Sequence, residues 1–299
     1  MRIALVSDCY LPRLGGIELQ VHDLAGQLIR AGHLVTVFTT TAGPRTPGDV
    51  PVVRLPAIAG VPLPSAIDEL HRELEHFDVV HAHTSLFSPL AWRAARLADG
   101  PLITMHSLPS PSLPWPLARL DRYVGAARWT AVSEVVADVL RRSLPDRVID
   151  VLHNGADPRD WRRPARPQHP LTIVSTMRLT RRKRPLALLR TLARVRELVP
   201  PEVDIRAVVV GSGNQATTVA THARQHGLAG WVELPGSMTR FEIQQLYAGA
   251  DVYLAPAELE SFGVAALEAR CAGLPRGRDG LRRGRRVHPA RHRGIPRAQ

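Results

Sequence analysis

The chain has 299 residues, of which 44% are hydrophobic and 22% are charged, a composition typical of a globular protein with room for two domains. No segment approaches the roughly 18 consecutive apolar residues of a membrane-spanning helix, and the polar residues near the start are unlike a secretory signal. The two cysteines, Cys9 and Cys271, lie far apart in the sequence and are expected to be free thiols. We therefore expect a cytoplasmic protein.

The formal net charge of +12 is concentrated near the C-terminus. Residues 276–299 contain nine arginines and one acidic residue, which leaves a charge of +4 for residues 1–275. The main part of the chain is only mildly basic, so no specific nucleic-acid partner is expected.

Short β-rich runs alternate with amphipathic helical patterns in the first half of the chain, which is typical of parallel α/β layers. Apolar residues at steps of three and four predict a helix between the first two strands, and Gly32 is positioned to end it. The strands predicted in this half are residues 2–7, 34–39, 78–82, 101–105, 129–132 and 148–152.

A segment rich in proline and arginine, residues 153–170, interrupts this alternation and predicts a linker. The alternation then resumes and ends with a helix at about 261–273. The strands predicted in the second half are residues 171–176, 204–210, 231–234 and 251–254. The sequence therefore predicts an α/β protein with two Rossmann-like βαβ domains, residues 1–160 and 161–275, that face a cleft at the carboxyl ends of their strands.

Residues 276–299 have neither a helical nor a strand period, although a further strand of the second domain is expected there. A disordered basic tail, a nucleic-acid-binding arm and a shifted reading frame all stay open for this segment. The frameshift hypothesis depends on composition: arginine, glycine, proline and alanine have GC-rich codons, and only one of the 39 basic residues is a lysine. Under this hypothesis the second domain is incomplete.

Two motifs that follow strands carry residues suited to phosphate groups. Gly15 and Gly16 lie between the first strand and the first helix, where paired glycines let backbone amides approach an anion, although a simple tight turn is the alternative. Arg178 and Lys183 follow the first strand of the second domain, and Lys183 is the only lysine in the chain. A single ammonium among so many guanidinium groups favours a phosphate contact, but solvated surface charge would give the same pattern.

Two further motifs lie later in the second domain. Gly211 begins a Gly-Ser-Gly turn after a strand, a common pattern that is compatible with close approach to a phosphate. Glu260, Phe262 and Gly263 precede a helix that carries Glu268, so one carboxylate lies at the helix N-terminus and another lies two turns further on. The alternative is that Glu260 only complements the helix dipole and that Glu268 is a surface acid.

In order and spacing, the paired glycines, the Arg-x4-Lys pair and the Glu-x7-Glu signature resemble the family 4 glycosyltransferases of GT-B fold, over residues 1 to about 275. The resemblance implies a retaining hexosyltransferase that moves a sugar from a nucleotide-diphosphate sugar to an acceptor hydroxyl. Residues 1–160 would be the acceptor-side domain and residues 161–275 the nucleotide-sugar-binding domain. No cofactor is implied besides this donor substrate.

The resemblance also implies roles for single residues. Arg178 and Lys183 would hold the donor diphosphate and neutralise the leaving group. Glu260 would contact hydroxyls of the transferred sugar, and Glu268 would contact the ribose. His106 matches the family's active-site histidine near the donor sugar. The residues that would approach the phosphates or the sugar are Gly15, Gly16, Gly211, Phe262 and Gly263.

The sequence departs from the family pattern at two places. Met177 stands where a glycine commonly precedes the arginine, and the later donor-domain elements, with a helix that crosses back to the first domain, are not found after Pro275. An inactive nucleotide-sugar-binding protein therefore stays open, as does a sugar-nucleotide epimerase of similar fold. No metal site is expected, because His81 and His83 lack further ligands and no Asp-x-Asp motif is present.

The acceptor and its surroundings are not defined by the sequence. A sugar, a lipid-linked compound or a small molecule would each fit as the acceptor. Trp115, Arg119 and Arg122 lie near a variable loop, so a peripheral contact with the inner face of a membrane stays open beside a solvated helix face. Both glutamates lie on one element, which suits binding better than the paired acid and base of a glycosidase.

Overall fold

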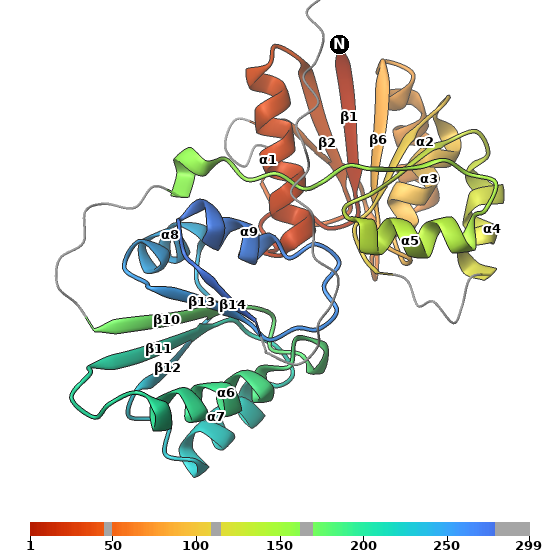
Figure 1. Ribbon diagram of the computed structural model, residues 1–299. Coiled ribbons are helices and arrows are strands. Elements are labelled where there is room, and N and C mark those ends of the chain that lie inside the picture. Colours follow the sequence, from red (N-terminus) through yellow and green to blue (C-terminus); the bar gives the residue numbers. More distant parts are fainter. Residues whose placement is uncertain (45–49, 109–114, 162–169, 279–299) are drawn as a thin grey trace, which may run out of the picture.

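The computed structural model describes residues 1–44, 50–108, 115–161 and 170–278. It consists of two α/β domains, each built around a parallel sheet, with a connecting segment that crosses between them (Figure 1). This arrangement confirms the fold class predicted from the sequence. None of the helices in these ranges is long and apolar enough to cross a membrane.

The larger sheet of the first domain has the strand order β3-β2-β1-β6-β7-β8-β9, and neighbouring strands are parallel. The order reverses beside β1, which makes the carboxyl ends of β1 and β6 a natural place for ligands. A short antiparallel pair, β4 and β5, lies outside this sheet. The strands are β1 (Arg2–Ser7), β2 (Leu34–Thr39), β3 (Val52–Arg54), β4 (Ala57–Ile58), β5 (Val61–Pro62), β6 (Val79–Thr84), β7 (Leu102–Met105), β8 (Arg128–Ala131) and β9 (Ile149–Val151).

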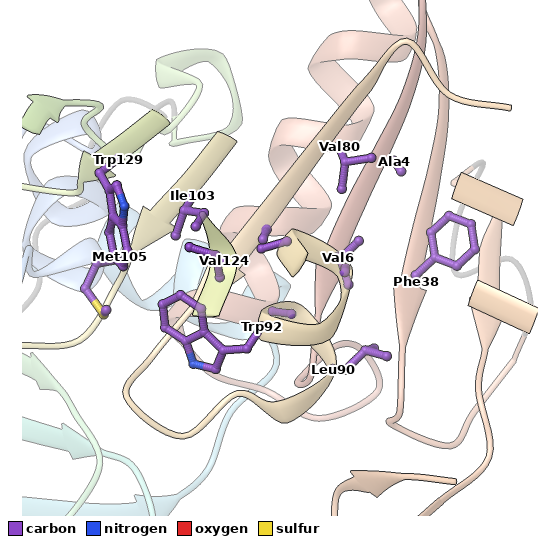
Figure 2. Packing of buried hydrophobic residues seen from close by; sticks show 14 of the residues in the cluster. Ala4, Val6, Phe38, Val80, Leu90, Trp92, Ile103, Met105, Val124 and Trp129 are labelled. Atoms are coloured by element: carbon purple, nitrogen blue, oxygen red, sulfur yellow. The ribbon is translucent and has the colours of Figure 1, made fainter. Parts of the chain in front are cut away.

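The helices of this domain cover the two faces of the sheet unequally. Helix α1 (Gly16–Arg30) packs on one face, over β1 and β2, and is followed after its C-cap, Ala31, by the predicted terminating glycine, Gly32, whose φ is +85°. Four helices cover the other face: α2 (Pro64–Leu74), α3 (Pro89–Leu97), α4 (Trp115–Val124) and α5 (Glu134–Ser143). Figure 2 shows the core below them, where Trp92 and Trp129 pack with ring centroids 5.7 Å apart. Large aromatic side chains stabilise such a core by the apolar area that they bury.

The second sheet has the strand order β12-β11-β10-β13-β14, again parallel. Helices α6 (Pro185–Leu198) and α7 (Ala216–Gln225) lie on one face, and helices α8 (Arg240–Ala248) and α9 (Val264–Cys271) lie on the face toward the first domain (Figure 1). The strands are β10 (Leu171–Thr176), β11 (Ile205–Val210), β12 (Val232–Gly236), β13 (Val252–Ala255) and β14 (Arg276–Arg278).

Strand β14 corrects the end predicted for the second domain. The sequence predicted that the regular structure stops at Pro275, but residues 276–278 pair with β13, with Tyr253 opposite Arg276. The Arg-Gly-Arg sequence lacks the apolar residues that are typical of a strand. The hydrogen bonds between β13 and β14 are formed by backbone groups, which are the same for any side chain. The rest of the predicted tail of residues 276–299 lies outside the described residues.

The predicted linker also contains regular structure. Residues Pro158–Trp161 form a 3-10 turn, η1, and Trp161 is buried in the core of the second domain, with its ring centroid 5.6 Å from that of Tyr247. The chain is therefore anchored to the second domain by Trp161. The predicted boundary between the two domains, at residues 160 and 161, stays a prediction.

Candidate active site

The paired glycines lie where the first domain meets the second. Gly15 is the N-cap of α1 in an extended conformation, and a Cβ atom there would lie 2.8 Å from Nη2 of Arg178 and would also collide with the carboxylate of Glu18. A Cβ at Gly16 would lie 3.8 Å from a methyl group of Val264, at the start of α9. A side chain at position 15 would therefore displace both the buried Glu18 carboxylate and the Arg178 guanidinium from their places beside the start of α1.

Lys183 and Glu260 form an ion pair in the second domain. The Nζ atom of Lys183 lies 2.5 Å from Oε2 of Glu260, and the two side chains are 23% and 24% exposed. A second pair, Arg184 with Glu258, joins the same two loops. The loops follow β10 and β13, two strands that are neighbours in the sheet, so the side chains meet at its carboxyl edge.

The segment before α9 connects this edge to the first domain. Phe262 packs against the main hydrophobic cluster of the first domain, and its ring centroid lies 5.8 Å from that of His153. The Ser133 hydroxyl donates a hydrogen bond to the carbonyl of Ser261. Gly263 adopts a left-handed conformation with φ +85° and begins the helix, a conformation that favours glycine.

The contacts described so far bring two helix N-termini together with two cations. Neither α1 nor α9 receives a hydrogen bond from a side chain at its N-cap. Their first backbone amides therefore stay available to an anion, and the helix dipoles favour negative charge at these ends. With Arg178 beside α1 and Lys183 beside Glu260, this meeting point of the two domains suits a ligand that carries more than one phosphate group.

Gly211 has a packing role in this site. Its φ is +143°, and a Cβ atom there would collide with the carbonyl oxygen of Met177. The loops on either side are joined by hydrogen bonds from the Met177 amide to the Val210 carbonyl (3.0 Å) and from the Leu179 amide to the Ser212 carbonyl (2.8 Å). Gly211 thus lets the loop that carries Arg178 pack closely against the end of β11.

Glu268 is buried rather than exposed, which corrects the alternative of a surface acid. It is 8% exposed on α9, and burial raises its pKa to about 7, although the nearby charge of Arg240 acts in the opposite direction. The helix period alone does not predict this burial, because the covering groups come from elsewhere in the chain. Its proposed contact with a ribose stays a prediction.

His106 belongs to a buried group of histidines on the α1 side of the first sheet. Its Nε2 lies 2.9 Å from Nδ1 of His83, and His81 is hydrogen-bonded to Thr104 at 2.7 Å. Burial lowers the pKa of His106 to about 3 and that of His81 to about 4, so both rings are neutral at ordinary pH. Any role of His106 would therefore be that of a neutral hydrogen-bonding group.

The histidines line a cavity of about 360 Å³ between α1, the sheet and residues 152–157. Within the described residues, His106 is the one predicted site residue that lines it, and no described contact joins His106 to Arg178, Lys183 or Glu260. The structure thus brings most of the predicted residues together around the starts of α1 and α9 and places His106 apart from them, in the first domain. In the described ranges, no group of three or more His, Cys, Asp or Glu residues is arranged to hold a metal ion.

Asp8 is a candidate that the sequence interpretation missed. It follows β1, and its carboxylate accepts hydrogen bonds from the amides of Leu90 (2.8 Å) and Ala91 (3.1 Å) at the start of α3. Burial raises its pKa to about 6. An acidic residue directly after the first strand, at the point where the strand order reverses, is a signal that could have identified it.

Two facing Rossmann-like domains, with cations and helix N-termini gathered between them, define the GT-B class of glycosyltransferases. A family model described as Glycosyltransferase Family 4 matches residues 14–160, and one described as Glycosyl transferases group 1 matches residues 156–276. The chain belongs to the family 4 glycosyltransferases.

Individual relatives agree with this family. The D-inositol 3-phosphate glycosyltransferase of Thermobifida fusca (strain YX) is 28% identical, over 87% of this chain and 72% of the relative. The glycogen synthase of Mycobacterium tuberculosis is 27% identical, over 92% of this chain and 77% of the relative. Among solved structures, Anabaena Alr3699/HepE in complex with UDP and glucose superposes with a TM-score of 0.75 at 17% identity, over 92% of this chain and 80% of that chain.

Proposed function

We propose that this glycosyltransferase moves a sugar from a nucleotide-diphosphate sugar to an acceptor hydroxyl with retention of the anomeric configuration. The observation that carries the proposal is the convergence of Arg178, Lys183 and the N-termini of α1 and α9 between the domains. Two cations and two helix ends match a diphosphate better than a single carboxylate or phosphate. A complex of the similar protein HepE contains UDP and glucose, which supports a donor of this class.

In the proposed reaction, the bond between the anomeric carbon and the diphosphate oxygen breaks while the acceptor oxygen attacks from the same face. The acceptor proton passes to the leaving diphosphate, so no enzymic nucleophile is needed. Negative charge develops on the diphosphate, where Arg178 and Lys183 would neutralise it. Glu260, now paired with Lys183, would accept hydrogen bonds from sugar hydroxyls once the ammonium turns to the phosphates.

The acceptor would reach the cleft from the first domain, where His106 presents a neutral imidazole. A sugar, a lipid-linked compound or a small molecule each carries the required hydroxyl.

Arg119 and Arg122 are exposed on α4, and a peripheral contact with an anionic membrane through them is part of the proposal, as is a cytoplasmic location. Binding to anionic vesicles, lost when both arginines are replaced by glutamine, would support this contact.

The reaction itself is tested by NMR on the anomeric protons. The purified chain is mixed with each member of a panel of nucleotide-diphosphate sugars, with and without candidate acceptors. A new glycoside with the donor's anomeric configuration supports the proposal. Inversion at the anomeric carbon, or interconversion of the donor with no acceptor present, would overturn it in favour of an inverting transferase or an epimerase.

Substitution of Gly15 by alanine is expected to lower kcat/KM for the donor by about 100-fold, because the new methyl group displaces the Arg178 guanidinium from its place beside α1. The melting temperature should fall as well, because the new methyl group would also lie 2.4 Å from Oε2 of Glu18, a buried side chain that is paired with Arg13. Steady-state kinetics and thermal unfolding measure the two effects. The matched control is Gly26→Ala on the same helix, where the nearest atom, Nη1 of Arg30, lies 3.6 Å from the new Cβ. Equal kinetics for both variants would contradict this role of Gly15.

A further inference from the structure

Arg240 links the two domains directly. It is the first residue of α8 and lies between Thr239 and Glu242, which form a capping box at the start of this helix. Its Nη1 lies 2.5 Å from Oδ1 of Asp23 on α1, and the two side chains are 22% and 26% exposed. Asp160, in η1 between the domains, lies 4.0 Å from Nη2. The ion pair therefore connects the second domain to the helix that begins with the paired glycines.

The guanidinium of Arg240 is held by the second domain and not only by its acidic partner. It lies over the indole of Trp161, 5.6 Å from the ring centroid, and Trp161 is buried against Tyr247. The Nε and Nη2 atoms are buried and have no hydrogen-bond partner among the described residues. A partly buried guanidinium that is stacked on an indole has a preferred position, so its pairing with Asp23 holds α1 against α8.

The same guanidinium also acts on Glu268. It lies over Trp161, which packs in one hydrophobic cluster with Ala266 and Ala269 on the helix that carries Glu268. The positive charge of Arg240 lowers the pKa of this carboxyl while burial raises it, and the charge of Asp23 raises it further. Among the described residues, Tyr247 on α8 and Cys271 on the same helix also interact electrostatically with Glu268, and Asp160 of η1 faces Arg240. Asp23 and Arg240 therefore shift the pKa of Glu268 in opposite directions, although they form one ion pair.

We infer that Arg240 is a positioning residue that sets domain closure through Asp23 and holds Glu268 ready to accept hydrogen bonds from the donor ribose. The second half of this inference depends on the proposed function. The relative position of α1 and Glu268 would then be set before a nucleotide that contacts both of them binds. The ion pair would then lower the cost of ordering the domains around the donor.

The test uses Arg240→Gln, Arg240→Lys and Asp23→Asn, with Arg224→Gln on the exposed side of α7 as the control. Small-angle X-ray scattering measures closure without any need for activity. Loss of either partner should increase the radius of gyration and raise the donor Kd by about tenfold. Arg240→Lys should keep part of the affinity, because it preserves the charge but not the planar stacking on Trp161.

The pH dependence of donor binding provides the sharper readout. Ionised Glu268 accepts hydrogen bonds, so affinity is present above its pKa and is lost as the pH falls through it. In the wild type this loss should be centred near pH 7. Arg240→Gln should move the midpoint to higher pH, and Asp23→Asn should move it to lower pH. A merely structural role would weaken binding in both variants without this opposite movement.

The outcomes separate the two proposals. If the wild type binds a donor but both variants keep its radius of gyration and pH midpoint, the role of Arg240 is wrong. If the wild type binds no donor, the proposed function fails, while scattering still tests closure. Should Arg240→Gln not fold, as circular dichroism would show, the Asp23→Asn and Arg240→Lys variants decide the matter.

Discussion

Substitution of Lys183 by alanine is expected to lower kcat for sugar transfer by about 100- to 1000-fold. The reason is the charge that develops on the leaving diphosphate, which the ammonium group would neutralise. In the structure this group is already positioned at the carboxyl edge of the second sheet by its ion pair with Glu260. Steady-state kinetics with a saturating donor measures the effect.

The control for this variant is Arg194→Ala, on the helix that follows Lys183. Arg194 also forms an ion pair, with Glu197 at 2.6 Å, but both side chains are more than 60% exposed. Exposed pairs of this kind contribute little, so kcat should stay unchanged. A Lys183→Ala variant with the kcat of the wild type would show that Lys183 does not contact the leaving group.

Substitution of Gly211 by alanine is expected to lower the free energy of unfolding of the second domain by about 3 kcal/mol or more. The conformation at φ +143° is one that other residues rarely adopt. The new methyl group would also collide with the Met177 carbonyl, a backbone group that cannot turn aside as a side chain can. Urea unfolding, followed by circular dichroism, measures the change.

A second glycine separates these two causes. Gly227 also has a positive φ, +66°, but no atom of the described part of the chain lies within 4 Å of the place where its Cβ would be. Gly227→Ala should therefore cost only about 1 kcal/mol, the penalty for a left-handed conformation without a collision. If both variants lost the same stability, the close packing at Gly211 would not be the cause.

The sequence predicted the central strands of both sheets well because these strands are buried on both faces, but it did not predict the short edge strand β3. Runs such as residues 2–7 and 205–210 are almost continuously apolar, and such runs leave few alternatives to a central parallel strand. Strand β14 could not be predicted in this way, because Arg-Gly-Arg has no apolar pattern and pairs only through its backbone. The burial of Trp161 was missed for a similar reason, since its neighbours in sequence resemble a linker.

The candidate site was predictable only in part. Glycines at strand ends and the Lys183 and Glu260 positions follow from local patterns and from the family resemblance. The ion pair of Arg240 with Asp23 joins residues 217 positions apart, and no local pattern indicates it. The buried contact between His83 and His106 likewise depends on two neighbouring strands being in register, which a single sequence does not reveal.

The central claim is that a diphosphate group binds between α1, α9, Arg178 and Lys183. Calorimetric titration tests it most directly, with a panel of nucleotide-diphosphate sugars and, for each, the matching nucleoside without phosphates. We expect one donor to bind and its nucleoside to bind at least about 100-fold more weakly, because the charged contacts would be lost. A folded chain that binds no donor, or that binds donor and nucleoside equally well, would contradict the claim.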